Sequence, residues 1–193
     1  MTTLTKTSGP DRDWLKTYYY LRFAVAALWV ALAFTVGRSM PALAAVMLVA
    51  YPAWDALANY LDASRSGGLA KNTSQVLNFI VSVLTAAAVA AALGHGMHAV
   101  LQVFGGWAAL SGLFQLITGV RRWKSYGAQW AMILSGAQSG LAGAHMLAKA
   151  AGAAPVSIAD IAPYAAFGAF YFLISAISLT ISDARRGSST AAA

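Results

Sequence analysis

Residues 109–136 read "ALSGLFQLITGVRRWKSYGAQWAMILSG", an apolar segment, a short basic turn with aromatic residues, and a second apolar segment. The first segment extends back to Met97 and the second continues to Ala150. An α-helix needs about 20 mostly apolar residues to cross the hydrocarbon core of a bilayer, and both segments meet that requirement. The stretch therefore predicts two membrane-spanning helices joined by a positively charged turn.

The composition of the whole chain agrees with a membrane location. Of the 193 residues, 59% are hydrophobic and 10% are charged, and the mean hydropathy is +0.62. A soluble domain has about 25% charged residues, so this chain has too few to cover a surface in water. The net charge of +7 is therefore assigned to membrane orientation, and we expect no nucleic-acid partner. The chain has no cysteine, which excludes disulfides and thiol chemistry.

The same apolar pattern predicts an all-α bundle of six transmembrane helices as a single domain over residues 14–186. The six spans are Trp14–Val36, Met40–Leu61, Thr73–Leu93, Met97–Val120, Ala128–Ala150 and Ile161–Ile181. We expect a cytoplasmic tail at residues 1–13 and a disordered C-terminal tail at residues 187–193. A cleaved signal peptide ending near "ALA" at residues 42–44 is the competing interpretation of the first span.

Lysine and arginine predict the orientation. With both termini on one side, that side holds 11 of the 13 basic residues and the other side holds only Arg38 and Lys149. Basic residues favour the cytoplasmic side of loops, so we expect both termini in the cytoplasm and the protein in the bacterial inner membrane.

A repeat relates spans two, four and six. In each span a polar residue precedes an arginine by ten positions and begins a polar stripe at helical spacing. The stripes are Asp55, Asn59 and Asp62; Ser111, Gln115 and Thr118; and Ser175, Ser178 and Ser182. The odd-numbered spans carry partial stripes, namely Gln75, Asn78, Ser82 and Thr85 in span three, and Ser135, Gln138 and His145 in span five. The pattern predicts three repeated helical hairpins with polar faces turned away from lipid.

Asp55 is the most extreme member of these stripes because an ionised carboxylate in hydrocarbon is costly. Three interpretations stay open: an ion pair with Arg22 that locks spans one and two, a proton- or ion-handling carboxylate, and a carboxyl kept neutral. The intramembrane polar candidates are Arg22, Asp55, Asn59, Ser111, Gln115 and Gln138.

The three histidines, His95, His98 and His145, lie toward the predicted outer surface. Histidine changes its charge between about pH 5 and 8, so they are candidates for a pH response, with plain solvated residues as the alternative. His95 and His98 are three residues apart, but too few further ligands accompany them for a metal site. We expect no metal, no cofactor and no catalytic activity, since no nucleophilic triad, carboxylate pair or phosphate-binding loop is visible. The "GAQSG" motif at 136–140, extended by Gly143, is typical of helix packing or of a subunit interface.

The chain resembles the HdeD family of bacterial acid-resistance membrane proteins, which is built from a short membrane repeat of unknown function. The resemblance is clearest across residues 105–150 and weaker for residues 40–93. The pattern that carries it is "SG" near the end of an apolar helix, followed by an aliphatic-aromatic pair and a basic cap, as in residues 109–136. It implies an inner-membrane location and a link to acid or envelope stress.

We therefore expect a non-enzymatic integral membrane protein. A small transporter or channel with Asp55 in an inward polar stripe is the alternative, and a scaffold for other membrane proteins is a third. The expected partners are the lipid bilayer and, through the small-residue faces, further copies of the chain or other membrane proteins.

Overall fold

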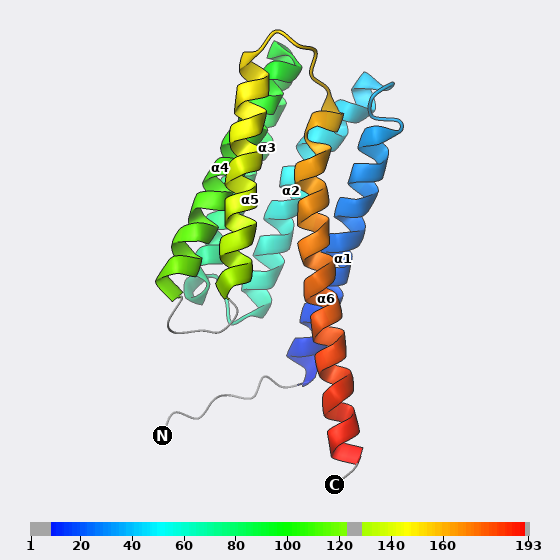
Figure 1. Cartoon of the computed structure of the whole chain (residues 1–193), viewed down its shortest axis with the longest axis vertical. Coiled ribbons are helices and arrows are strands. Elements are labelled where there is room, and N and C mark those ends of the chain that lie inside the picture. Colours follow the sequence, from blue (N-terminus) through cyan, green and yellow to red (C-terminus); the bar gives the residue numbers. More distant parts are fainter. Residues whose placement is uncertain (1–8, 123–128, 192–193) are drawn as a thin grey trace. The chain divides into compact units, whose positions relative to one another are not determined.

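The computed structural model describes residues 9–122 and 129–191, and all regular structure in these ranges is helical (Figure 1). The α-helices are α1 (Gly9–Phe34), α2 (Pro41–Arg65), α3 (Thr73–Ala92), α4 (Met97–Arg122), α5 (Gln129–Ala151) and α6 (Ala162–Ala191). Short 3-10 turns are η1 (Leu69–Lys71), η2 (Leu93–His95) and η3 (Ile158–Asp160). The chain divides into two compact units. Unit 1 comprises residues up to 28 together with those from 165 onward, and unit 2 comprises residues 29–164.

The predicted spans and the observed helices agree closely except at their polar ends. α1 begins at Gly9 rather than Trp14, and α2 continues to Arg65 rather than ending at Leu61. α6 runs to Ala191, so residues 187–191 of the predicted disordered tail are helical. Hydropathy marks only the part of a helix that can lie in hydrocarbon, whereas the backbone hydrogen bonds continue into the polar flanks.

Five of the described helices are long and apolar enough to cross a membrane, as expected of a multi-pass membrane protein. They are α1, α2, α3, α4 and α6. α5 falls below this threshold within the described residues, because it carries Gln138, His145 and Lys149 among its apolar residues. The composition of α5 thus separates it from the other predicted spans.

Within unit 2 the closest helix pairs are α4 with α5 and α2 with α3, and α3 also packs on α4 (Figure 1). These two closest pairs join helices from different predicted hairpins. The arrangement as three repeated hairpins therefore stays a prediction. What the structure does place together is the polar stripe of α2 and that of α3.

An aromatic cluster forms part of the core of unit 2. The ring of Trp107 in α4 lies 5.8 Å from Phe104, 6.1 Å from Tyr51 and 5.9 Å from Tyr164, measured between centroids. Tyr51 in turn lies 4.8 Å from Trp29, whose indole N–H donates a 2.8 Å hydrogen bond to the Met47 carbonyl. Tilted and edge-on contacts between rings stabilise a core by more than the burial of their apolar surface alone.

Glycines bring α4 and α5 into direct backbone contact. A Cβ atom added at Gly112 would lie 2.5 Å from the Gly140 nitrogen and 2.6 Å from the Gly136 oxygen. One at Gly143 would lie 2.6 Å from the Ala109 nitrogen. The small-residue face predicted at residues 136–143 is thus confirmed as a helix-packing surface, with its partner on the same chain.

The turn between α2 and α3 is closed by two glycines and an asparagine. Gly67 has φ +97°, and the amide of Gly68 donates to the Ala63 carbonyl at 3.0 Å, the pattern of a Schellman motif. The side-chain amide of Asn72 lies 2.8 Å from the Gly68 carbonyl oxygen and 2.9 Å from that of Ser66. The Asn72 side chain thus ties together the carbonyl groups of the turn that follows α2.

We expect Asn72→Ala to destabilise this turn by about 1 kcal/mol, because the carbonyls of the turn lose their side-chain donor. Stability can be followed by circular dichroism as sodium dodecyl sulfate displaces a mild detergent. Ser74→Ala, a change at the exposed second residue of α3, is the matched control and should leave the midpoint unchanged. Equal midpoints for the two variants would contradict the capping role.

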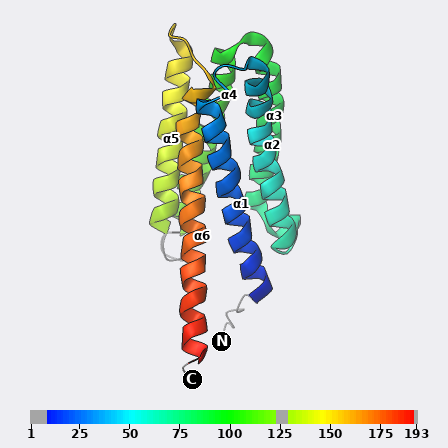
Figure 2. The same cartoon turned by 90° about the vertical axis from the view of Figure 1, so that its right-hand side faces the viewer.

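Unit 1 pairs most of α1 with nearly all of α6 (Figure 2). The Lys16 ammonium lies 3.5 Å from the Asp183 carboxylate, and the hydroxyls of Tyr20 and Thr180 are 3.1 Å apart. The ring of Tyr19 stacks on that of Phe172, with centroids 6.3 Å apart. Polar contacts therefore join the two helices along the part of α6 that lies nearest the C-terminus.

Candidate functional site

Asp55 lies at the centre of a hydrogen-bonded cluster between α2 and α3. Its Oδ2 atom accepts a 2.8 Å hydrogen bond from the Ser82 hydroxyl and a 3.0 Å bond from the Asn59 side-chain amide. The same amide also lies 2.8 Å from the Asp55 backbone carbonyl. Ser82 is 1% exposed and Asn59 is 8% exposed. Protein donors therefore supply hydrogen bonds that water would otherwise provide to this carboxylate.

The position of Asp55 along α2 makes this cluster costly to build in a membrane. At 1.5 Å per residue, Asp55 lies about 15 Å from the Arg65 end of α2 and about 21 Å from the Pro41 end. That is near the middle of a hydrocarbon core about 30 Å thick. Polar groups at such depth need partners inside the protein, which Ser82 and Asn59 provide.

The two polar stripes meet in antiparallel register. Seven residues beyond Asp55 in α2, Asp62 accepts a 3.3 Å hydrogen bond from Gln75, which lies seven residues before Ser82 in α3. Seven residues are two helical turns, so both contacts lie on the same faces of the two helices. Sequence reasoning found both stripes but did not foresee the hydrogen bond between Asp55 and Ser82. The sequence signal for this pairing is the equal spacing in the two stripes. Asp55 and Asp62 are seven residues apart in α2, and Gln75 and Ser82 are seven residues apart in α3.

Arg22 belongs to unit 1, where aromatic residues surround its guanidinium group. It donates a 2.9 Å hydrogen bond to the Tyr18 hydroxyl and lies 4.2 Å from the centroid of the Phe172 ring. Arginine stacks well on aromatic faces because its planar cation is weakly hydrated. The ion pair between Arg22 and Asp55 stays a prediction.

The other polar candidates lie along the α4–α5 pair, and Ser111, Gln115 and Gln138 are all half-buried. The Cβ atom of Gln115 lies 3.0 Å from the position that a Cβ on Gly136 would take. Within the described part of the chain, the buried Oε1 atom of Gln115 has no hydrogen-bond donor. A buried amide oxygen without a donor costs about 1–3 kcal/mol, so this position is the least satisfied of the polar stripe.

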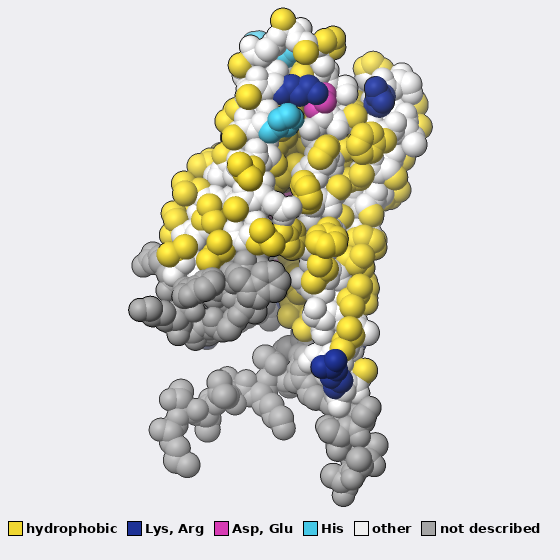
Figure 3. Space-filling model, viewed as in Figure 1, with side chains coloured by type: hydrophobic (Ala, Val, Ile, Leu, Met, Phe, Trp, Pro, Cys, Tyr) yellow, Lys and Arg dark blue, Asp and Glu magenta, His cyan; other side chains and the backbone are white. Residues whose placement is uncertain are grey.

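The three histidines gather at one end of unit 2, here called the histidine end (Figure 3). His95 and His145 are exposed, and the Nε2 atom of His98 lies 3.1 Å from the Ala154 carbonyl oxygen. None of the described residues forms a group of three metal-ligating side chains. The described geometry thus offers contacts between His98 and the α5–α6 connection, and no cluster that would hold a metal ion.

An ion pair fixes the α5–α6 connection at the same end. The Lys149 ammonium donates a short hydrogen bond to the Asp160 carboxylate, which also accepts a 2.6 Å bond from the Ser157 amide. Partial burial by itself favours the neutral acid, but the bonds from Lys149 and Ser157 outweigh it and lower the pKa of Asp160. Sequence reasoning counted Lys149 among the basic residues but found no role for Asp160.

We expect acid to weaken this connection only well below neutral pH. A carboxyl whose pKa is lowered on folding adds stability above its unfolded pKa, near 4, and that stability is lost as pH falls through the folded value. Wild-type thermal stability in detergent should therefore fall more steeply than that of Asp160→Asn as the pH drops below about 4. Lys149→Gln should shift the loss to higher pH. Parallel curves for wild type and Asp160→Asn would refute the role of this carboxylate.

Part of the chain matches a known family. Residues 80–148 match the family described as a short repeat of unknown function (DUF308). The match covers just over a third of the chain and takes in most of α3, all of α4 and most of α5. No curated protein and no solved structure matches the chain.

The matched segment contains the glycine contact between α4 and α5, and it begins two residues before Ser82. It overlaps the stretch on which the resemblance to the HdeD family rests. Together with the apolar helices, the match supports a membrane protein of unknown function. Membership of the HdeD family itself stays a prediction.

Proposed function

We propose that the chain is a non-enzymatic integral membrane protein that stabilises or senses the membrane environment under acid or envelope stress. The observation that carries this proposal is the bonding of Asp55 to Asn59 and Ser82. A carboxylate held by two protein donors acts as a link between helices, whereas a conducting carboxylate needs contact with water or ions. The resemblance to the HdeD family supports the link to acid.

We propose that all six α-helices cross the bacterial inner membrane as three hairpins, with both termini in the cytoplasm. α5 is included because it lies antiparallel to α4 and touches it at backbone level. Helices packed this closely extend through the same layer of the membrane. The distribution of basic residues supports the orientation.

The partners we propose are the lipid bilayer and either further copies of this chain or other membrane proteins. Many apolar side chains are exposed on the described helices, among them Leu84, Leu141 and Phe170. In water such a surface would drive aggregation, but in a bilayer it is the surface that contacts lipid or a neighbouring protein.

Deletion in the native host tests the stress proposal. We expect the deletion strain to survive an acid challenge less well than its parent, and a plasmid copy of the wild-type chain to restore survival. A copy carrying Gly112→Leu, which removes the α4–α5 contact, should not restore it. Unchanged survival of the deletion strain under acid and under envelope stress would reject the proposal.

The alternative is a small transporter or channel, and the buried Oε1 atom of Gln115 favours it. A polar atom without a donor inside the bundle is what a partly hydrated path would leave. In sealed vesicles, a conduction path centred on Asp55 predicts proton or ion flux after external acidification, and its loss in Asp55→Asn. Asp62→Asn, nearer the end of α2, is the control. Vesicles that stay tight at every pH would leave only the structural role.

A further inference from the structure

An apolar groove of about 410 Å³ runs between α2 and α3 on the side away from α4. Its walls are Ala53, Ala56, Leu57 and Tyr60 from α2 and Phe79, Val83 and Ala86 from α3. On each helix the first and last lining residues are seven residues apart, so the groove is about 10 Å long. All of its lining belongs to unit 2.

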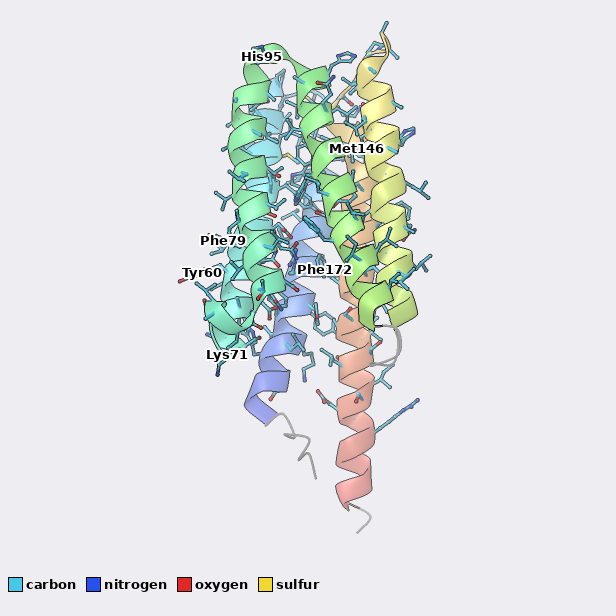
Figure 4. The ribbon with its side chains drawn as sticks, turned by 90° about the vertical axis from the view of Figure 1, so that its left-hand side faces the viewer. Tyr60, Lys71, Phe79, His95, Met146 and Phe172 are labelled. Carbon is cyan, nitrogen blue, oxygen red and sulfur yellow. The ribbon has the colours of Figure 1, made fainter. Side chains whose placement is uncertain are left out.

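The groove exists because small residues lie between larger ones. Ala53, Ala56 and Ala86 leave space between the helices, while Leu57 and Val83 form the rims and are 48% and 44% exposed. At one end the rings of Tyr60 and Phe79 lie 5.8 Å apart (Figure 4). A long flexible hydrocarbon chain fits such a shape, because it fills a narrow apolar channel without needing polar partners.

Polar groups lie at the same end of the groove as the rings of Tyr60 and Phe79. Tyr60 is 42% exposed, and within the described residues its hydroxyl makes no hydrogen bond. Beyond it, Arg65 is exposed at the last position of α2. Lys71 is exposed in η1, within the connection to α3 (Figure 4). Arg65 follows Tyr60 by about 7.5 Å along the helix. Along the helix axis, the apolar lining is thus followed by a hydroxyl group and then by two cations at the end of α2 and in η1.

We propose that this groove binds one anionic glycerophospholipid. An acyl chain lies between the alanines of α2 and α3, the ester region meets the Tyr60 hydroxyl, and the phosphate meets Lys71 and Arg65. Tyrosine favours the interface between hydrocarbon and water, and basic side chains just outside the hydrocarbon attract anionic headgroups. A helix from another protein fits this groove less well than a lipid. It would need a long apolar face, and cations at one end of the groove would not strengthen its binding.

The absence of native cysteine allows a direct test by site-specific fluorescence. A bimane label on Val83→Cys reports on the groove, and one on Leu84→Cys reports on the neighbouring surface of α3 at the same depth. Each labelled protein is placed in phosphatidylcholine vesicles that contain either brominated phosphatidylglycerol or brominated phosphatidylcholine. Bromine quenches bimane on contact, so the quenching curves give the relative affinity for the two lipids.

At position 83 we expect phosphatidylglycerol to be preferred over phosphatidylcholine by about fivefold or more, and at position 84 we expect no preference. Lys71→Gln with Arg65→Gln should reduce the preference at position 83 to near one, whereas Arg38→Gln should leave it unchanged. Ala53→Phe, which fills the groove from an exposed position, should bring quenching at position 83 down to the level at position 84.

Two results would overturn the proposal. Equal quenching by both lipids at position 83 would mean that ordinary boundary lipid passes over the groove. No quenching by either lipid at position 83, with normal quenching at position 84, would mean that a second copy of the chain covers it. Far-ultraviolet circular dichroism of each variant establishes that the helices are intact.

Discussion

Gly112→Ala should destabilise the protein by about 3 kcal/mol, a large effect for the addition of one methyl group. The new Cβ would lie 2.5 Å from the Gly140 nitrogen and 2.6 Å from the Gly136 oxygen. Both contacts are with backbone atoms, which cannot move aside as a flexible side chain can. α4 and α5 would have to separate, and the close packing along their glycines would be lost.

The same helix pair supplies matched controls for this change. A Cβ at Gly106 or at Gly140 would meet no atom within 4 Å outside its own helix turn. Alanine has the higher helix propensity, so Gly106→Ala and Gly140→Ala should be neutral or stabilising by up to about 1 kcal/mol. Unfolding in mixed detergent micelles, followed by circular dichroism, compares all three variants. A Gly112→Ala midpoint equal to that of Gly140→Ala would contradict the close contact.

The glycine contact also shows how far sequence reasoning could go. The small-residue spacing from Gly136 to Gly143 predicted a packing face, since glycines three and four apart share one side of a helix. It could not identify the partner, because packing against α4 and packing against a second copy require the same spacing. Residues on α4 decide between them, and Gly112 becomes informative only when its distance to Gly140 is known.

The polar stripes were also predicted from helical spacing, and here too the spacing did not identify which residues they contact. Periodicity placed Asp55 and Asn59 on one face of span two and Ser82 on one face of span three. Depth arithmetic then favoured Arg22 as the partner of Asp55, since the strongest charge was assumed to find the opposite charge. The structure adds two neutral donors to Asp55 that this arithmetic did not foresee, Ser82 and Asn59. The pairing with Arg22 stays a prediction. Which neighbours meet is set by the register of the two helices, and a single helix carries no information about that register.

The connection between α5 and α6 was the least predictable part. Asp160 lies in a 3-10 turn outside any apolar span, so the hydropathy pattern did not predict where its side chain would lie. Its contact with Lys149 joins residues on either side of the α5–α6 connection. Short polar turns of this kind are fixed by local hydrogen bonds, which leave only a weak pattern in the sequence.

Asp55→Ala should cost about 2 kcal/mol of stability, because it leaves the Ser82 hydroxyl buried without its acceptor. Ser82 is 1% exposed, so water cannot replace the carboxylate. Asn59 loses less, since its amide still lies 2.8 Å from the backbone carbonyl of residue 55. Asp55→Asn retains a side-chain oxygen that can accept from Ser82, and its cost should stay below about 1 kcal/mol.

A double-mutant cycle with Ser82→Ala isolates the contact. If Asp55 and Ser82 stabilise the α2–α3 pair through their hydrogen bond, the cost of Asp55→Ala should fall by about 1–2 kcal/mol when Ser82 is already alanine. Thr85→Ala is the matched partner change, since Thr85 is buried one turn along α3 and donates to Val81 in its own helix. Additive costs for Asp55 and Ser82 would show that the carboxylate stabilises no contact with α3. The flux measurement on Asp55→Asn would then become the decisive test of why a carboxylate lies at this depth.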